Sequence, residues 1–343
     1  MYTKLEDSRF PFAWKCGRIL RYTKTGMACL AGLLAASSAL AADDAIWTAQ
    51  PLTKTLAATA GASPMPEAYA RFSVNHEALL DALNRAPMEF AASAAQQSLV
   101  MNLPMPDGNL ARFRIEESPI LSPELQARYP DIRTYVAQGV DDPAATGRLD
   151  VTPLGFHAYV MSEQGTVVVN PVSATDQDAY LSFRKHDAPG GGFECLTRDD
   201  GLQDAQPPLA HVLASPNNPS GTQLRTYRLA VSATGEYTRW AAGLVAGCTV
   251  GGATWPACGT TAATAQITTT MNRVTGIYEQ ELAIRLNLTA TNIYDDPGSD
   301  PFTGNDVNAM LGQNQTDLDT NVGSANYDVG HVLSRDTRLN GVA

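Results

Sequence analysis

Hydrophobic and polar positions alternate along most of the stretch from Tyr69 to about Leu181. A period of two places one side of each strand in a core and the other side in solvent. The pattern predicts one short helix over 76–84 and strands over 70–74, 97–104, 110–116, 148–153, 155–161, 165–172 and 179–183. We therefore expect an antiparallel, β-rich domain over residues 69–185.

The pattern changes in the second part of the chain, residues 224–343. In order, it predicts a strand over 227–234, a helix over 262–282, a strand from Ile284, a short helix near 316–322 and a strand over 327–334. Strands joined by helices run parallel, because the helix returns the chain to the same end of the sheet. The predicted fold class is α+β, with an antiparallel β-rich domain followed by a mixed α/β layer.

Glycine and proline are frequent in the stretch between these two parts. Gly190-Gly191-Gly192 and Pro207-Pro208 both fall there, and a stretch of this kind holds no regular element and is open to proteases. We expect residues 186–223 to be a linker. The Ala-, Thr- and Pro-rich residues 43–68 are expected to be a flexible N-terminal segment.

The first 42 residues have the organisation of an export signal. Their 18 uncharged residues between Lys24 and Asp43 follow a basic stretch, and Ala39-Leu40-Ala41 is a small-x-small cleavage site. An uncleaved membrane anchor is the alternative, since 18 residues nearly span a bilayer. The Ala and Ser content favours cleavage. We therefore expect residues 1–42 to be a signal peptide and the mature chain to be secreted or periplasmic, with no membrane contact.

Composition narrows the class of protein. The 343 residues are 44% hydrophobic and 17% charged, which is enough apolar material for ordinary cores and argues against wholesale disorder. The formal net charge is −11. This acidic excess argues against nucleic-acid binding, which needs clustered basic side chains to neutralise phosphates.

Three cysteines follow the leader. Cys248 and Cys258 flank a glycine-rich loop, and in an oxidising compartment we expect them to pair, with two unpaired thiols as the alternative. Cys195 is then left over.

Histidine spacing gives no metal site. No two of the five histidines are closer than 25 residues, so no pair stands at i and i+4 on one helix. His76-Glu77 begins like H-E-x-x-H, but Leu80 occupies the place of the second histidine. The acidic loop 295–300 lacks EF-hand spacing and reads better as a solvated turn than as a calcium site. Spacing therefore predicts no complete catalytic site.

Several segments are nevertheless distinctive. They are YRLAVSATGEYT at 227–238, TTMNRVTGIYEQEL at 269–282, MLGQNQ at 310–315, SANYDVGHV at 324–332 and, upstream, FRIEESPI at 113–120, DDPAAT at 141–146 and LDVTPLGFHA at 149–158. Together these segments resemble the precursors of secreted bacterial metalloproteases of the reprolysin-like (M12B-type) branch of the metzincins. The similarity extends over about residues 69–343.

The resemblance implies an exported, zinc-dependent metalloendopeptidase precursor. Residues 69–185 would be a pro-domain that inhibits the enzyme intramolecularly, and 186–223 would contain the activation cleavage region. In that family an H-E-x-x-H-x-x-G-x-x-H helix holds zinc, and its glutamate activates the metal-bound water against protein or peptide substrates. The chain ends at Ala343 before such a motif. We therefore expect residues 224–343 to be an incomplete catalytic domain, inactive alone and without zinc ligands, and calcium dependence is left open.

An incomplete domain has a consequence for stability. Without the zinc-binding helix, apolar surface around Ile267, Met271, Val274 and Leu286 should be uncovered. We accordingly expect the second part to be poorly stable by itself.

The resemblance also suggests site residues. An edge strand of the substrate cleft would be formed by Tyr327, Asp328, Val329, Gly330, His331 and Val332. By position His331 would be a partly buried strand residue rather than a zinc ligand. Cys195 lies where a pro-region thiolate occupies zinc in some latent precursors, and a free thiol or a disulfide to another residue are the alternatives.

A hypothesis from another class remains beside the protease. The chain would be a secreted binding or inhibitory module that carries a degenerate protease-like region. An H-E-x-x-H-x-x-G-x-x-H helix encoded downstream would decide for the protease.

Overall fold

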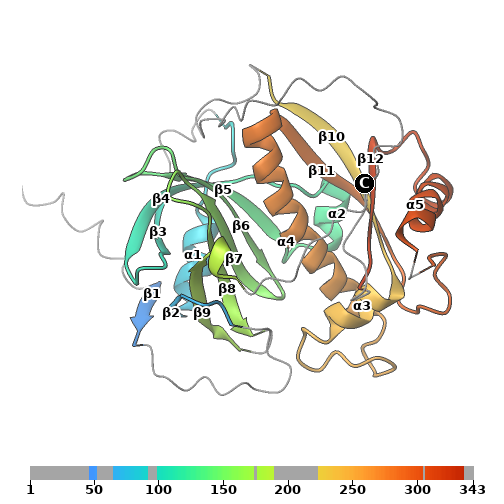
Figure 1. Ribbon diagram of the computed structural model, residues 1–343, viewed down its shortest axis with the longest axis horizontal. Coiled ribbons are helices and arrows are strands. Elements are labelled where there is room, and N and C mark those ends of the chain that lie inside the picture. Colours follow the sequence, from blue (N-terminus) through green and yellow to red (C-terminus); the bar gives the residue numbers. More distant parts are fainter. Residues whose placement is uncertain are drawn as a thin grey trace, which may run out of the picture. The chain divides into compact units, whose positions relative to one another are not determined.

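The computed structural model describes residues 46–51, 65–91, 99–173, 176–188, 223–303 and 306–335 (Figure 1). All of them belong to one compact unit, Ala42–Ala343. The predicted signal peptide, Cys195 and most of the predicted linker lie outside the described residues. Among the described helices, none combines the length and apolarity needed to cross a bilayer.

The first part is a nine-stranded antiparallel sheet with the order β1-β2-β9-β8-β7-β6-β5-β4-β3. Its strands are β1 Trp47–Gln50, β2 Ala70–Val74, β3 Leu99–Pro104, β4 Leu110–Glu117, β5 Arg133–Gly139, β6 Thr146–Thr152, β7 Gly155–Met161, β8 Val167–Ser173 and β9 Asp176–Arg184. The sheet curls toward closure: β1 contacts β3, and the Ser182 hydroxyl of β9 donates a hydrogen bond to the Pro104 carbonyl of β3 at 2.9 Å. The antiparallel, β-rich prediction is confirmed.

Two of these strands were not predicted. Strand β1 lies inside the expected flexible segment 43–68 and pairs with β2, which corrects that expectation. The physical reason is that Ile46 and Trp47 are buried in the core, where the Trp47 ring packs edge-on against Tyr180 at 5.2 Å. Strand β5 was missed because its sequence, RTYVAQG, has few large apolar residues.

Three short helical elements accompany this sheet: α1 His76–Asn84, α2 Pro123–Arg128 and the 3-10 turn Lys185–Asp187. The Asn75 side chain caps α1 by accepting a hydrogen bond from the Ala78 amide. Ser122 caps α2 in the same way, accepting from the Leu125 amide.

The second part is a three-stranded sheet of parallel strands in the order β11-β10-β12. Its elements are β10 Arg225–Ala233, α3 Gly235–Ala242, α4 Ala257–Leu282, β11 Ile284–Ile293, α5 Val307–Asn321 and β12 Val329–Leu333. Parallel strands joined by helices agree with the prediction. Helix α5 is longer than expected because the Asp306 side chain caps it at the Asn308 and Ala309 amides. Buried Asp317 then ties α5 to the sheet by accepting hydrogen bonds from the Ser232 and Tyr294 hydroxyls.

The two parts share one hydrophobic cluster. On the second part's side it contains α4 and the facing residues of β10 and β11, and on the first part's side it contains Ile120, Leu121, Leu125, Ile132 and Leu154. The backbone joins them as well, since the Ser122 amide donates to the Leu288 carbonyl at 2.8 Å and Leu121 bridges to Leu288. Figure 1 shows α4 between the antiparallel strands and β11.

This packing corrects the expectation of uncovered apolar surface. Ile267, Met271 and Leu286 are only 0%, 5% and 6% exposed, and Val274 packs partly buried against the same cluster. The expectation was wrong because residues of the first part, together with the strands, cover these side chains.

Candidate functional site

Strand β12 is an edge of the parallel sheet. It pairs with β10 over Leu229↔Val329 to Ala233↔Leu333, and no strand of the described part of the chain pairs with its other side. An edge of this kind presents N–H and C=O groups that an extended peptide can use. Val329, Gly330 and His331 are exposed. Desolvation by neighbouring groups nevertheless lowers the pKa of the His331 imidazole, so the expectation of a partly buried His331 stays a prediction.

The two residues before β12 are engaged within the protein. The Tyr327 hydroxyl donates a hydrogen bond to Asp319 at 2.8 Å, and Asp328 receives the Arg228 guanidinium at 2.7 Å. Hydrogen bonds from the Arg228 side chain and backbone amide lower the pKa of Asp328 to about 2. Of the six residues predicted for the cleft edge, Tyr327 and Asp328 thus anchor the strand, 329–331 are exposed and Val332 is half-buried.

Gly330 allows β12 to lie close to α5. A Cβ atom at this position would come 2.6 Å from the Leu318 side chain, which is too close for any real contact. Because successive residues of a strand point to opposite faces, Val329 and His331 lie on the other face, the same one as Leu333. Leu333 packs against the cluster that contains α4.

Helix α4 has a second buried face, which is polar and meets strand β6. The Thr269 hydroxyl donates to the Asp150 carboxylate at 2.7 Å, and the Asn272 side-chain amide donates to the Leu149 carbonyl at 2.8 Å. His157 lies with its Nδ1 3.0 Å from the same Asp150 oxygen. Since an ionised carboxylate only accepts hydrogen bonds, His157 donates here. Asp150 therefore connects two strands of the sheet to the helix.

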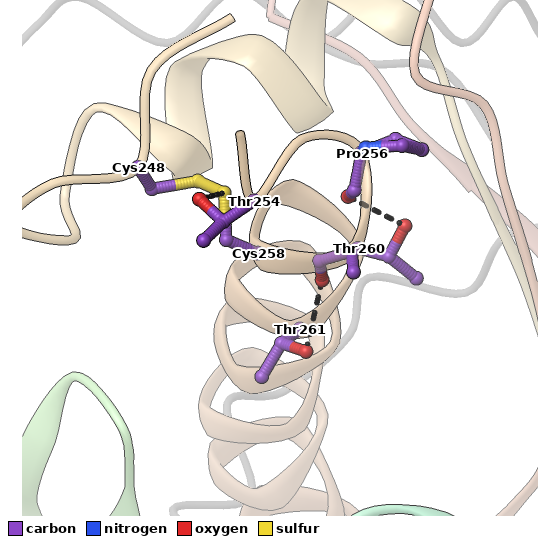
Figure 2. Close-up of a disulfide and its surroundings, with 7 residues drawn as sticks. Cys248, Thr254, Pro256, Cys258, Thr260 and Thr261 are labelled. Atoms are coloured by element: carbon purple, nitrogen blue, oxygen red, sulfur yellow. Dashed lines mark hydrogen bonds between the residues drawn. A yellow bond between two sulfur atoms is a disulfide. The ribbon is translucent and has the colours of Figure 1, made fainter. Parts of the chain in front are cut away.

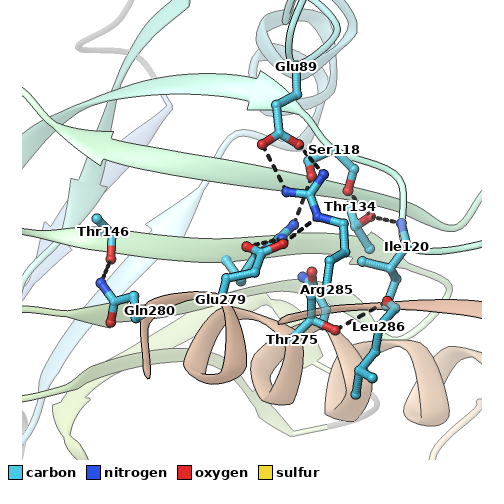
Figure 3. A network of polar contacts seen from close by, with 12 residues as sticks. Glu89, Ser118, Ile120, Thr134, Thr146, Thr275, Glu279, Gln280, Arg285 and Leu286 are labelled. Atoms are coloured by element: carbon cyan, nitrogen blue, oxygen red, sulfur yellow. Dashed lines mark hydrogen bonds and ion pairs between the residues drawn. The ribbon is translucent and has the colours of Figure 1, made fainter. Parts of the chain in front are cut away.

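A chain of buried charges continues this interface toward the end of α4 (Figure 3). Arg285, at the start of β11, makes a bidentate contact with Glu89 at 2.9 Å for both bonds and also contacts Glu279. Glu279 in turn pairs with Arg148 of β6 at 2.5 Å, and Arg148 donates to the Ser118 hydroxyl at 2.9 Å. Glu89 and Arg148 belong to the first part of the chain, and Glu279 and Arg285 belong to the second. The chain of charges therefore exists only when the two parts are together.

Burial sets the electrostatics of these arginines. The Arg148 side chain is 2% exposed, and desolvation lowers its pKa. Burial also opposes the charge of Arg285, but the hydrogen bonds that Arg285 donates to Glu89 and Glu279 outweigh it and raise the pKa of Arg285. Buried charges of this kind are held only where opposite charges and hydrogen-bond partners compensate them.

Gly276 marks the closest approach of α4 to β6. A Cβ atom added there would lie 2.7 Å from the Cγ atom of Arg148. Beside this point lies an open pocket of about 540 Å³ between the helix and the sheet. Its lining includes the polar side chains of Arg114, Gln138 and Gln280.

The predicted cysteine pair forms a disulfide in the structure, with an S–S distance of 1.98 Å between Cys248 and Cys258 (Figure 2). Cys258 lies in the first turn of α4, and Cys248 follows α3. The Thr254 hydroxyl donates to the Cys258 sulfur at 3.4 Å. The bridge therefore fixes the beginning of α4 to the end of α3.

The described residues do not form a metal site. In this part of the chain, no three His, Cys, Asp or Glu side chains come together as metal ligands would. The acidic loop 295–300 uses its carboxylates internally: Asp296 pairs with Arg239 at 2.8 Å, and Asp300 accepts a hydrogen bond from the Gly235 amide at 2.8 Å. The residues present therefore do not fit zinc, and no step of hydrolysis is derived through it.

Part of the chain is similar to a known protein family. Residues 264–343 match the family model described as Reprolysin_3, Metallo-peptidase family M12B Reprolysin-like. No curated protein matches the chain. The matched residues begin in α4 and include β11, α5 and β12, which is the second part of the chain without β10 and α3. The match indicates a protease-related function, in a family that is generally zinc-dependent.

Sequence reasoning missed the polar face of α4. This face was nevertheless visible as Thr269, Asn272 and Gly276, spaced by three and four residues. All three are buried. Two stripes at helical spacing indicate a helix that is covered on two sides.

Proposed function

We propose that the chain is the precursor form of an exported metalloendopeptidase-like protein. In this proposal, residues 223–335 bind an extended peptide along β12, and residues 46–188 are the pro-segment that covers α4. One observation supports the proposal most strongly. The family match over 264–343 contains the edge strand β12, whose residues 329–331 are exposed.

Strand addition explains how the peptide would be held. Main-chain hydrogen bonds to the free side of β12 supply affinity that does not depend on sequence, and neighbouring side chains supply preference. Val329 and His331 point to one face of the sheet and would meet the peptide's side chains there. The Arg228–Asp328 pair fixes the beginning of the strand, so the register of the edge is defined before a peptide arrives.

The metal chemistry is not assigned to any described residue. When zinc is bound in this family it supplies an activated water, but the described residues hold no ligand set for it. Two further proposals concern residues outside the described ranges. Cys195 would be the thiolate that blocks zinc in the latent precursor, which Cys195→Ser would test by loss of latency, and residues 1–42 would direct export to the periplasm or the medium.

Hydrogen exchange tests the peptide-binding proposal. The full chain is incubated with a pool of unstructured peptides, and amide exchange is followed by mass spectrometry. We expect slower exchange over 327–334 and little change in β3, the edge strand of the other sheet. Unchanged exchange over 327–334 at saturating peptide would contradict the proposal.

A matched pair of ligands sharpens this test. A binding peptide is N-methylated at every second residue, in two versions that are offset by one position. Because only alternate amides of a strand face a given neighbour, one version should lose the protection of 327–334 and the other should keep it. Equal protection by both versions would contradict strand addition.

A further inference from the structure

We infer that cleavage of the linker does not separate the two parts of the chain: residues 46–188 remain bound to residues 223–335 as a non-covalent pair, with α4 as the surface that retains them. The inference rests on the proposed function only in naming the first part a pro-segment. It means that cutting the linker is not sufficient to free α4.

The described apolar contacts at this interface come from both parts. Ile120, Leu121 and Leu125 belong to the same buried cluster as Ile267 and Leu288. The backbone pairing of residues 120–122 with Leu288 adds hydrogen bonds in both directions, because Leu288 also donates to Ile120 at 2.6 Å. An interface that resembles a divided core is typical of permanent association.

The polar contacts define one mutual position of the two parts. Asp150 receives Thr269, the Leu149 carbonyl receives Asn272, and Arg148 pairs with Glu279. These groups are buried, so a shifted or partial contact would leave donors, acceptors or charges without partners, which is costly. We therefore expect a two-state pair, either fully docked or apart, rather than a loose association.

The covalent connection between the two parts raises the local concentration of each part around the other. A tether of this kind acts through an effective concentration in the millimolar range. Cutting it removes this contribution and leaves every contact described above in place. The pair should then persist at ordinary protein concentrations.

The experiment uses the full chain with a recognition sequence for a site-specific protease inserted within residues 189–222. After complete cutting, we expect both pieces in one peak of a size-exclusion column and one 1:1 complex by native mass spectrometry. A denaturing gel without reductant should show two separate bands, which excludes a covalent link. Two separate peaks in non-denaturing buffer would overturn the inference.

A pair of glycine variants tests whether α4 is the retaining surface. Gly276→Leu places a side chain against Arg148, whereas a Cβ at Gly312, in helix α5, has no neighbour within 4 Å. Overpacking should weaken the cut Gly276→Leu pair by roughly tenfold to a hundredfold on dilution, and cut Gly312→Leu should behave as the unsubstituted protein. Equal dissociation of the two variants would overturn the role of α4.

A second pair covers the case in which Gly276→Leu fails to fold before cutting. Leu125→Ala removes a buried side chain of the first part from the shared cluster, and Leu80→Ala removes an exposed one. We expect easier dissociation of the cut protein only for Leu125→Ala. Dissociation that is unchanged by Leu125→Ala would contradict the inference, whatever the result for Gly276. The peptide-protection test over 327–334 is independent of these results and fails or succeeds separately.

Discussion

The nine-stranded sheet and the three-stranded sheet of this protein build their cores differently. The larger sheet packs residues of its own segment inside its curl, and every member of that cluster lies within residues 46–180. The smaller sheet is parallel and needs a layer on each face. Helix α5 supplies one layer and α4 the other, and α4 then requires a cover for its own outer surface. That cover is the polar side of β6 together with residues 120–132 and Leu154.

The comparison shows that the two segments depend on each other to different degrees for their cores. An antiparallel meander finds its partners in neighbouring hairpins. A three-stranded parallel unit of this size shares part of its core with another segment. Substitutions at the shared surface should therefore destabilise the protein more than matched substitutions elsewhere.

The largest single-residue effect is expected for Arg148→Ala. It removes a buried guanidinium and leaves Glu279 with less compensation, and breaking a buried ion pair in this way costs about 3–5 kcal/mol. The control is Arg112→Ala, which breaks an exposed pair with Asp141 and should change stability little. Urea unfolding of both variants measures the difference. Equal midpoints would contradict the importance of the charge chain.

The next largest loss of stability is expected for Leu288→Ala. Leu288 is fully buried where β11 meets residues 120–122, and large-to-small substitutions at such sites cost about 2–5 kcal/mol. Leu282→Ala, at the exposed end of α4, is the matched control. An equal fall in the melting temperature of the two variants in a thermal scan would contradict the importance of the shared cluster for stability.

Thr269→Val should have a moderate effect. The substitution keeps the shape but removes one of the two donors to buried Asp150, the other being His157, and a hydrogen bond to a charged group contributes about 1.5–3 kcal/mol. Thr316→Val serves for comparison, because the exposed Thr316 hydroxyl bonds only to the carbonyl of Gly312 in its own helix. Chemical denaturation should separate the two variants. A harmless Thr269→Val would indicate that the Asp150 contact adds nothing.

The smallest effect is expected at the free edge and concerns pH. Asp328 has a pKa of about 2 in the folded protein, below the value of about 3.9 expected for an unfolded chain. The Arg228 pair therefore stabilises the fold fully above the unfolded pKa, and this contribution is lost as the pH falls from about 4 through about 2. The difference in stability between Asp328→Asn and the unsubstituted protein should be constant from pH 5 to 8 and shrink below pH 4. A difference that already shrinks between pH 7 and 5 would contradict the low pKa.

Most of the helices and strands could be predicted from the sequence. The apolar stripe from Ile267 to Leu282 predicted α4, and the alternation in 284–290 predicted β11, because local periodicity reports which side of an element is buried. Strand β5 was not readable, since small residues such as Ala137 and Gly139 weaken the period. The start of α4 at Ala257 was missed because the cysteine loop appeared to precede the helix.

The site was readable only in part. The segment 327–334 was predicted as a strand, and Cys248 with Cys258 as a pair. The internal bonds of Tyr327 and Asp328 depend on residues as distant as Arg228, and such contacts leave no local pattern. The residues that cover α4 could not be predicted for the same reason, because Thr269 and Asp150 are 119 residues apart in the sequence. Periodicity indicates that the polar face of α4 is buried, but it does not identify the residues that bury it.

Thermal unfolding of residues 223–343 alone, followed by circular dichroism, tests most directly whether the second part depends on the first. We predict a shallow, non-cooperative change for the isolated segment and a cooperative transition once residues 42–188 are added as a separate chain. A cooperative transition of residues 223–343 by themselves, unaffected by the added segment, would contradict the account.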